Sequence, residues 1–240
     1  MANVDYFTEK ITSIKEPVGL IVLPEMFASG FTMQPSKVAE TMDGEMLSRL
    51  KTLAKAKNAA ITGSLVIEEN GCFYNRLVFV YPTGEIKTYD KRHLFSLAGE
   101  EKIYTAGSKK LIVDYNGWKI CLMVCYDLRF PVFSRNVENY DLLVYVANWP
   151  KVRIQAWDIL LRARAVENLS YVVGVNRTGL DGNDHEYNGH SQTLDFLGNY
   201  VLAPQEKDGI FIVDIDKKQM LETRDKLGFL NDKDAFTVSG

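Results

Sequence analysis

The chain has few cysteines, no excess of basic residues and no long apolar run. Each of these absences excludes a class of protein. Cys72, Cys121 and Cys125 form an odd, sparse set without metal-ligand spacing, so we expect neither a disulfide framework nor a zinc site. A formal net charge of −3 gives no reason to expect a nucleic-acid partner. No apolar run approaches the ~20 residues of a membrane span, and the first residues lack a signal-peptide layout. We therefore expect a cytoplasmic protein with no membrane or nucleic-acid partner.

The sequence does contain many short apolar runs separated by turn signals. Of its 240 residues 46% are hydrophobic and 25% are charged, which is typical of one globular domain over residues 1–240. Continuous apolar runs at 20–23 and 142–146 favour strands buried on both faces. Asn70-Gly71 and Asn116-Gly117 predict hairpin turns, and 154–169 predicts a long helix. Further strands are predicted at 60–67, 74–81, 86–89, 111–115, 118–124, 171–176, 191–194, 200–202 and 210–215, with shorter helices at 7–14, at 46–53 and after Pro131. Hairpins mixed with βα units predict an α/β fold of two packed sheets with helices outside.

Cys125 is the first candidate for chemistry. It ends the apolar run 119–125, and polar residues follow at once, so its side chain is predicted at the carboxyl end of a strand, where α/β proteins bind ligands. A cysteine in an apolar strand is more often core packing, and Cys121 fits that alternative. A nucleophilic cysteine needs nearby positive charge to gain thiolate character.

Two charged residues also follow apolar strands. Lys91 would place an ammonium beside the thiol, lower the thiol pKa and stabilise a developing oxyanion. Glu25 ends the 20–23 run and would act as a general base. Each has an ordinary alternative, a solvated charge for Lys91 and a loop cap for Glu25. No spacing rule forces the three residues together.

Other chemistries are less well supported. A dyad of Cys125 with a histidine stays open, but His185 and His190 flank a polar loop, and there is no G-x-S-x-G elbow. Neither a metal signature nor a phosphate-binding glycine loop is present, so we expect no metal and no nucleotide cofactor.

The motifs taken together resemble the nitrilase superfamily of carbon–nitrogen hydrolases, and most closely its ω-amidase branch. The matching stretches are LIVLPEMFASGF (20–31), YDKRHLFSLAGE (89–100), LMVCYDLRFPVFSRN (122–136), YVANWP (145–150), RARAVENLSYVVGVNR (162–177) and RDKLGFLNDKDAF (224–236). The resemblance implies a four-layer α-β-β-α sandwich, no cofactor, and a homodimer or larger homo-oligomer. It also implies that Cys125 is the nucleophile, Glu25 the base, Lys91 the family lysine and Glu100 a second glutamate that orients them.

The resemblance further implies hydrolysis of the terminal amide of small 2-oxo acid amides such as 2-oxoglutaramate, through a Cys thioester. Candidates for substrate binding are Phe31, Tyr126 (through its backbone N–H), Arg129, Asn148 and Trp149. The substrate carboxylate calls for a cation, from Arg129 or Arg177, although Arg129 could instead pair with Asp127. Two other readings stay open, namely another superfamily reaction on a nitrile or an N-carbamoyl substrate, and an inactive scaffold.

The sequence departs from the family in one respect. Family members usually begin with an apolar strand ahead of the first helix, whereas this sequence starts at that helix, with 24 residues before Glu25. We expect the missing strand to expose the edge of its neighbour and to remove core contacts.

Overall fold

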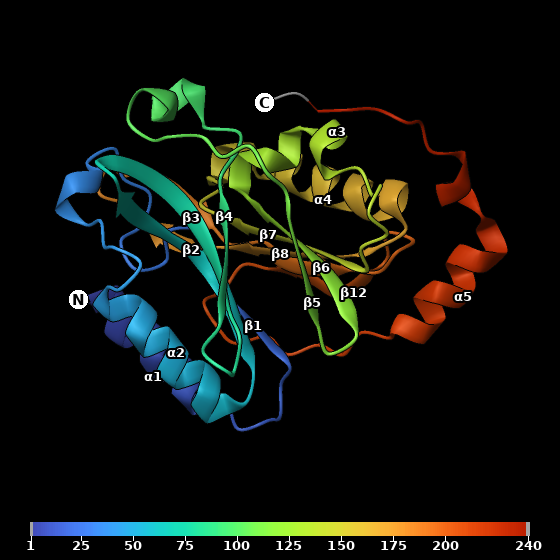
Figure 1. Ribbon diagram of the computed structural model, residues 1–240, viewed down its shortest axis with the longest axis horizontal. Helices are drawn as coiled ribbons and strands as arrows, with labels where there is room; N and C mark the ends of the chain where they lie inside the picture. The colour runs from blue at the N-terminus through green and yellow to red at the C-terminus, as the bar shows by residue number, and fades with distance from the viewer. Residues whose placement is uncertain (1, 239–240) are drawn as a thin grey trace.

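Two β-sheets face each other across a common core, with helices on both outer faces (Figure 1). The computed structural model describes residues 2–238. The first sheet has the strand order β1-β2-β3-β4 and the second β12-β11-β8-β7-β6-β5. The strands are β1 (Leu20–Val22), β2 (Ala60–Glu69), β3 (Cys72–Val80), β4 (Ile86–Asp90), β5 (Leu111–Tyr115), β6 (Trp118–Val124), β7 (Leu142–Ala147), β8 (Tyr171–Asn176), β11 (Ser191–Leu194) and β12 (Tyr200–Gln205).

The helices cover the outer face of each sheet. Helices α1 (Ala2–Ser13) and α2 (Glu45–Lys57) lie against the first sheet, and α3 (Pro131–Ser134) and α4 (Ile154–Asn168) against the second (Figure 1). A further helix, α5 (Lys217–Leu227), lies at the far end of the second sheet (Figure 1). This arrangement confirms the four-layer α-β-β-α sandwich. Among residues 2–238, no helix is long and apolar enough to cross a membrane.

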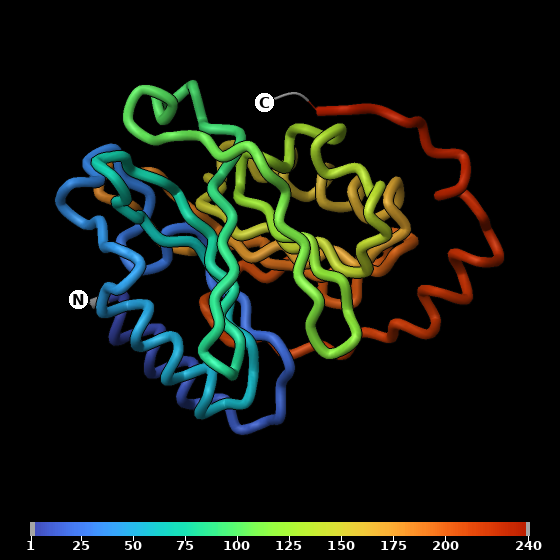
Figure 2. The backbone as a smooth tube through the Cα atoms, in the orientation of Figure 1, coloured from blue at the N-terminus to red at the C-terminus, as the bar shows by residue number. Residues whose placement is uncertain are grey.

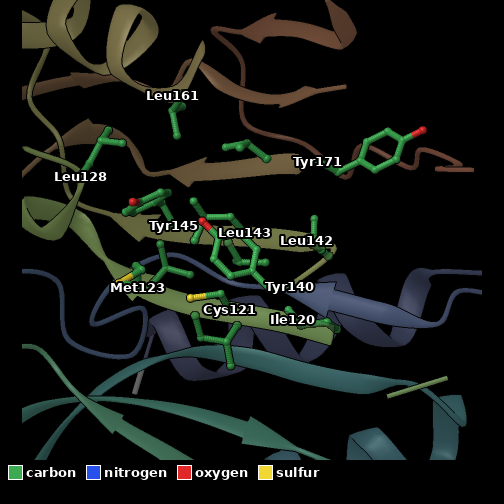
Figure 3. Packing of buried hydrophobic residues seen from close by; sticks show 14 of the residues in the cluster. Ile120, Cys121, Met123, Leu128, Tyr140, Leu142, Leu143, Tyr145, Leu161 and Tyr171 are labelled. Atoms are coloured by element: carbon green, nitrogen blue, oxygen red, sulfur yellow. The ribbon is translucent and has the colours of Figure 1, made fainter. Parts of the chain in front are cut away.

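The alternation of side chains along β3 explains why the sheets are buried on both faces. Leu77 and Phe79 pack in the core between the sheets, while Val78 and Val80 pack towards α1 and α2. The central core continues through β6 and β7, and Figure 3 shows Cys121 among its side chains. Cys121 is fully buried, so its assignment to core packing is confirmed.

The two Asn-Gly pairs form the predicted hairpin turns. All four residues have positive φ, 53° and 75° for Asn70 and Gly71, and 48° and 77° for Asn116 and Gly117. Asparagine and glycine tolerate this left-handed backbone better than other residues, and it matches the twist of antiparallel strands. β2 therefore pairs with β3, and β5 with β6, in antiparallel register.

One predicted strand is wrong. Residues 210–215 pair with no neighbour, although their sequence is apolar, and they run from β12 towards α5 (Figure 2). A strand forms only where its backbone hydrogen-bonds to another strand, and, among the described residues, those at 210–215 make no backbone hydrogen bond, either to the free edge of β1 or elsewhere. A short hairpin of β9 (Thr178–Leu180) and β10 (Glu186–Asn188) was not anticipated.

Candidate active site

Polar side chains from four strand ends meet between the two sheets. Glu25 follows β1, Lys91 follows β4, Cys125 follows β6 and Asn148 follows β7. The structure therefore brings together residues that the sequence spacing alone could not join. Glu100 reaches the same point from a one-turn 3₁₀ helix, η3 (Glu100–Lys102).

The Glu25 carboxylate is buried and held by four donors. Its Oε1 accepts from Lys91 Nζ at 3.0 Å and from Asn75 Nδ2 at 2.7 Å. Its Oε2 accepts from the backbone N–H of Asn148 at 2.8 Å and from Asn148 Nδ2 at 3.4 Å. Asn148 Nδ2 also donates to the Glu25 carbonyl oxygen at 2.8 Å. Glu25 is only 1% exposed. These hydrogen bonds therefore fix the position of its carboxylate, because no water competes for its oxygens.

Lys91 lies between two carboxylates. Its Nζ is 3.0 Å from Glu25 Oε1 and 2.9 Å from Glu100 Oε2, and all three side chains are at most 1% exposed. Burial alone would lower the pKa of Lys91, but the Glu100 and Glu25 carboxylates outweigh it and raise this pKa well above its ordinary value. Lys91 therefore stays an ammonium at any ordinary pH. It can stabilise negative charge but cannot accept a proton.

Cys125 carries its thiol beside Glu25 and Lys91 at a strained turn. Its φ is 45°, in the left-handed region, which is incompatible with an extended strand. β6 therefore ends at Val124, and the chain turns sharply into the 3₁₀ helix η4 (Cys125–Arg129). Burial and the Glu25 carboxylate raise the pKa of the thiol well above its ordinary value, and Lys91 offsets only part of this rise. Lys91 thus lowers the pKa of the thiol, as expected from the sequence, but the net shift is upward. The resting thiol keeps its proton.

Asp127 ties the Lys91 segment to the Cys125 turn, and sequence analysis missed this role. Its buried carboxylate accepts from Tyr89 Oη at 2.7 Å, from the backbone N–H of Val124 at 2.9 Å and from the backbone N–H of His93 at 3.0 Å. Its Oδ1 also lies 2.7 Å from His93 Nδ1. The only sequence signal was a carboxylate two residues after the candidate nucleophile. The alternative in which Asp127 pairs with Arg129 is wrong, because these contacts hold it instead.

The histidines are engaged with carboxylates. His93 contacts Asp127, His185 contacts Asp181, and His190 contacts Asp158. The polar groups acting on the Cys125 sulfur are instead Glu25, Lys91 and the backbone of Asn148. The geometry thus favours the Cys–Lys–Glu arrangement over a Cys–His dyad.

Aromatic rings and two arginines surround the turn that carries Cys125. The ring of Tyr126 contacts Phe95, with centroids 5.1 Å apart. The Arg129 guanidinium lies 4.9 Å above the Trp149 ring, and that of Arg153 lies 5.2 Å above Phe95. Phe95 and Arg153 were not singled out in the sequence, and no motif identified them.

The remaining sequence candidates are Phe31 and Arg177. Phe31 is half-buried and packs against Met26, Val66 and Tyr104. The Arg177 guanidinium lies 4.7 Å above the Tyr187 ring, and its Nη2 donates to the Leu180 carbonyl oxygen.

Asn75 and Asn148 each have one buried hydrogen-bond acceptor that is unpaired among the described residues. Their Oδ1 atoms have no hydrogen-bond partner among residues 2–238, although their Nδ2 groups both donate to Glu25. Asn75 was missed in the sequence, where a polar residue inside the apolar strand 72–80 was the available signal. A ligand N–H group near Glu25 would satisfy such an acceptor.

The site thus combines a protonated thiol, a carboxylate fixed beside it and a permanent cation. A carboxylate can take the thiol proton as the sulfur attacks, and a fixed ammonium can stabilise an oxyanion. Attack on an acyl carbon is the reaction class that needs this combination.

Comparison with known proteins gives the same picture. The sequence profile of the carbon–nitrogen hydrolase family matches residues 2–225. Omega-amidase YafV of Yersinia enterocolitica is 42% identical over 241 residues, covering 99% of this chain and 92% of that protein. A 2-oxoglutaramate amidase of Bacillus subtilis is 32% identical, covering 95% and 88%. The crystal structure of a CN-hydrolase superfamily protein from Xanthomonas campestris, which carries an arsenic adduct in its active site, superposes with a TM-score of 0.96 at 41% identity, covering 99% and 93%.

Proposed function

The chain belongs to the carbon–nitrogen hydrolase family, within the nitrilase superfamily, and we propose that it is an ω-amidase that hydrolyses the terminal amide of small 2-oxo acid amides to ammonia and a 2-oxo diacid. The observation that carries the proposal is the buried ion-pair set in which Lys91 bridges Glu25 and Glu100 beside Cys125. The relatives named for ω-amidase and 2-oxoglutaramate amidase activity support the substrate class.

The first half-reaction makes a thioester. Glu25 removes the proton of the Cys125 thiol while the sulfur attacks the amide carbon, so no free thiolate has to exist in the resting enzyme. The carbonyl oxygen gains negative charge, which Lys91 and the backbone N–H of Tyr126 stabilise. This N–H lies in the first turn of η4, where backbone donors have no helical acceptor. The C–N bond then breaks, and protonated Glu25 gives its proton to the departing ammonia.

The second half-reaction reverses the proton path. Glu25 takes a proton from water, and the resulting hydroxide attacks the thioester carbon. The same oxyanion contacts stabilise the second tetrahedral intermediate, which collapses to the carboxylic acid. The Cys125 thiolate is the leaving group and regains its proton from Glu25. Glu100 acts as a positioning residue, because it holds Lys91 Nζ and accepts from the backbone N–H of Phe95 at 2.6 Å.

The arginines near the turn that carries Cys125 support selection of a substrate with a distal carboxylate. Arg129 and Arg153 lie over aromatic rings, an arrangement that leaves the edge of a guanidinium able to bind a carboxylate with two hydrogen bonds. We place the carboxylate of the 2-oxo acid amide there and its terminal amide at Cys125. The unpaired Asn148 Oδ1 would accept from the amide N–H₂ group.

Ammonia release from 2-oxoglutaramate tests the proposal. The wild type and Cys72→Ala should release ammonia at the same rate, because Cys72 is exposed and outside the site. Cys125→Ala should be inactive, and Glu25→Gln should retain less than about 1% of kcat because it lacks the base. Equal rates for the wild type and Cys125→Ala would refute the proposal.

A substrate panel separates the open alternatives. An aliphatic nitrile and an N-carbamoyl amino acid, each compared with 2-oxoglutaramate, should be poor substrates. A preference for either one would assign another reaction of the superfamily. No turnover of any of the three by a folded wild-type protein would favour an inactive scaffold.

A further inference from the structure

The two oxygens of the Glu25 carboxylate have unequal surroundings. Oε1 accepts from Lys91 Nζ at 3.0 Å and from Asn75 Nδ2 at 2.7 Å, so both of its lone-pair positions are occupied. Oε2 accepts one short hydrogen bond, from the backbone N–H of Asn148 at 2.8 Å. Its contact with Asn148 Nδ2 is 3.4 Å long, and that group has a better acceptor in the Glu25 carbonyl oxygen at 2.8 Å. Oε2 therefore keeps a position for a proton, whereas Oε1 has none.

The contacts of the Cys125 sulfur indicate the same oxygen. Hydrogen bonds to the Glu25 carboxylate and to the backbone of Asn148 both act on the Cys125 thiol. The backbone N–H of Asn148 also donates to Glu25 Oε2. Because one N–H group serves both the sulfur and Oε2, these two atoms are neighbours. The thiol proton thus has a short path to Oε2.

The orientation of the Asn75 side chain is set by two carboxylates. Its Nδ2 donates to Glu25 Oε1 at 2.7 Å and also reaches Glu100 Oε1 at 3.4 Å. A flipped amide would direct Oδ1 at both carboxylates and would lose these bonds. Asn75 keeps its orientation although its Oδ1 has no hydrogen-bond partner among residues 2–238. The amide thus serves Glu25 and leaves its own acceptor unsatisfied, whereas buried polar groups are normally paired.

The first sheet holds both partners of the bond between Asn75 and Glu25. The backbone oxygen of Asn75, on β3, accepts from the backbone N–H of Lys91 at 3.0 Å. On β2, Ser64 Oγ accepts at 2.8 Å from the backbone N–H of Met26, which directly follows Glu25. Met26 has a φ of 43°, so the chain bends at this point. Neither the carboxylate nor its donors can turn without loss of these contacts, and the unequal filling of the two oxygens is a fixed property of the fold.

We propose that Asn75 is a positioning residue that occupies Glu25 Oε1 and thereby confines the thiol proton to Glu25 Oε2. The inference rests on the proposed function for the role of Glu25 as the base. As the sulfur attacks the amide carbon, the S–H electron pair forms the C–S bond, the proton binds to Oε2 and the carbonyl electron pair moves to oxygen. When the C–N bond breaks, its electron pair stays on nitrogen, which takes the proton from Oε2 and leaves as ammonia. Oε1 keeps its two donors throughout.

Alkylation of Cys125 by iodoacetamide measures this proton transfer without the amide substrate. The sulfur displaces iodide, and the thiol proton passes to Glu25 as in the first half-reaction. Rates are measured by mass spectrometry from pH 5 to 9 in a Cys72→Ala background, because Cys72 is exposed, whereas Cys121 is buried.

The other ionisable neighbours of Glu25 leave this pH range clear. Burial opposes the charge of Lys91, but Glu100 and Glu25 raise its pKa well above the ordinary value, so it stays an ammonium. Burial raises the phenol pKa of Tyr104 and Tyr187, which both feel the Glu25 charge, so they stay neutral. Changes of rate therefore report on the two carboxyl groups, the thiol and any group introduced beside them.

Asn75→Leu removes the donor and keeps a side chain of similar size. The acidic limb of the alkylation profile should move to higher pH by about one unit, because a hydrogen bond to the charged form of the base is lost. The plateau rate should fall at least tenfold, because Oε1 is then free to take the proton away from the sulfur. With 2-oxoglutaramate, kcat should fall by the same factor and KM should change by less than about threefold. An unmoved limb, or a plateau rate equal to that of the wild type, would overturn the proposal.

Asn75→Asp tests for rescue by a side chain of the native shape. The introduced carboxyl can donate to Glu25 Oε1 only while it is protonated, and the two neighbouring carboxylates favour its protonated form. At pH 6 this variant should be alkylated at least tenfold faster than Asn75→Leu, and the advantage should diminish as the introduced carboxyl ionises at higher pH. Equal rates for the two variants at pH 6 would contradict the proposal.

Asn168 provides the matched control, a buried asparagine at the end of α4. Its Oδ1 accepts from the backbone N–H of Asn136 at 2.9 Å, and its Nδ2 donates to the Arg164 carbonyl oxygen at 3.0 Å. It precedes the start of β8, whereas the site follows the carboxyl ends of β6 and β7. Asn168→Leu should destabilise the fold in urea at least as much as Asn75→Leu but should leave the acidic limb in place. An equal shift in both variants would assign the effect to lost stability and overturn the proposal.

Ammonia release separates this inference from the proposed function. The expected alkylation pattern, with no ammonia released from 2-oxoglutaramate by the wild type, would refute the substrate and leave the role of Asn75 standing. Ammonia release, with identical alkylation profiles for the wild type and Asn75→Leu, would refute the role of Asn75 alone.

Discussion

Replacement of Lys91 by methionine removes the cation from a buried cluster and leaves two carboxylates facing each other. Glu25 Oε1 and Glu100 Oε1 lie 3.0 and 3.1 Å from the same Lys91 nitrogen. They are thus no more than about 6 Å apart, and their repulsion at an effective dielectric constant of ~20 is about 3 kcal/mol. Loss of one partner from a buried ion pair typically costs about 3–5 kcal/mol. We expect the free energy of unfolding of Lys91→Met, measured in urea at pH 8, to fall by that amount.

The pH dependence of the Lys91→Met deficit identifies its cause. Repulsion between Glu25 and Glu100 raises the pKa of one carboxyl in the folded variant above its unfolded value of about 4.3. A group with a raised folded pKa stabilises the protein below its unfolded pKa and loses this contribution as the pH rises through the folded pKa. The deficit relative to wild type should therefore shrink as the pH falls from 8 towards 5.

Lys110→Met is the matched control for Lys91→Met. Lys110 pairs with Glu138 at 2.9 Å near the surface, so its loss should cost less than about 1 kcal/mol and should not vary over this pH range. Lys91→Met should also lower kcat for 2-oxoglutaramate at least ~100-fold, through the lost oxyanion contact. Equal deficits in the two variants, or a Lys91→Met deficit that does not change with pH, would refute this reasoning.

Further variants test the other parts of the site. Asp127→Asn weakens the acceptor that joins Tyr89 to the Cys125 turn. We expect kcat to fall while KM changes by less than about threefold, and the free energy of unfolding in urea to fall by about 1.5–3 kcal/mol. The raised pKa of the Cys125 thiol keeps it protonated above pH 8.5, where the unfolded chain ionises; wild type should lose about 1.4 kcal/mol per pH unit more than Cys125→Ala between pH 9 and 10, and parallel curves would contradict the raised pKa. The double variant Arg129→Gln/Arg153→Gln should raise KM for 2-oxoglutaramate at least ~10-fold with kcat nearly unchanged, and an unchanged KM would exclude these arginines as the carboxylate site. Sedimentation should give twice the 27.2 kDa chain mass if the protein is the homodimer that the family resemblance implies, and a monomer would contradict that expectation.

Local chemistry made much of the fold predictable. Asn70-Gly71 and Asn116-Gly117 specify hairpin turns by themselves, because both residues of each pair accept a left-handed backbone. Continuous apolar runs marked β1 and β7; every side chain of β7 is buried, whereas in β1 only Ile21 is buried. The failure at residues 210–215 has the opposite cause. Apolar composition shows that a segment can form a strand, but a strand also requires backbone hydrogen bonds to a neighbouring strand, which residues 210–215 do not make among the described residues.

The candidate site was predictable only through its motifs taken together. Asn75, Asp127 and Arg153 act through contacts with residues far away in the sequence, so no spacing rule could identify them. The thiol pKa illustrates the same limit. The residue types suggested a cation that lowers the pKa of Cys125, but burial and the Glu25 carboxylate reverse the net direction.

The sequence alone determined the strand ends, the turns and the residue types available for chemistry, since each depends on neighbours along the chain. Tertiary structure decided which of those ends meet, because Glu25, Lys91 and Cys125 follow strands of two different sheets and converge only when the sheets pack. It also decided that Lys91 remains charged and that Cys125 remains protonated, because desolvation and Coulomb energies depend on distances and burial in the folded state.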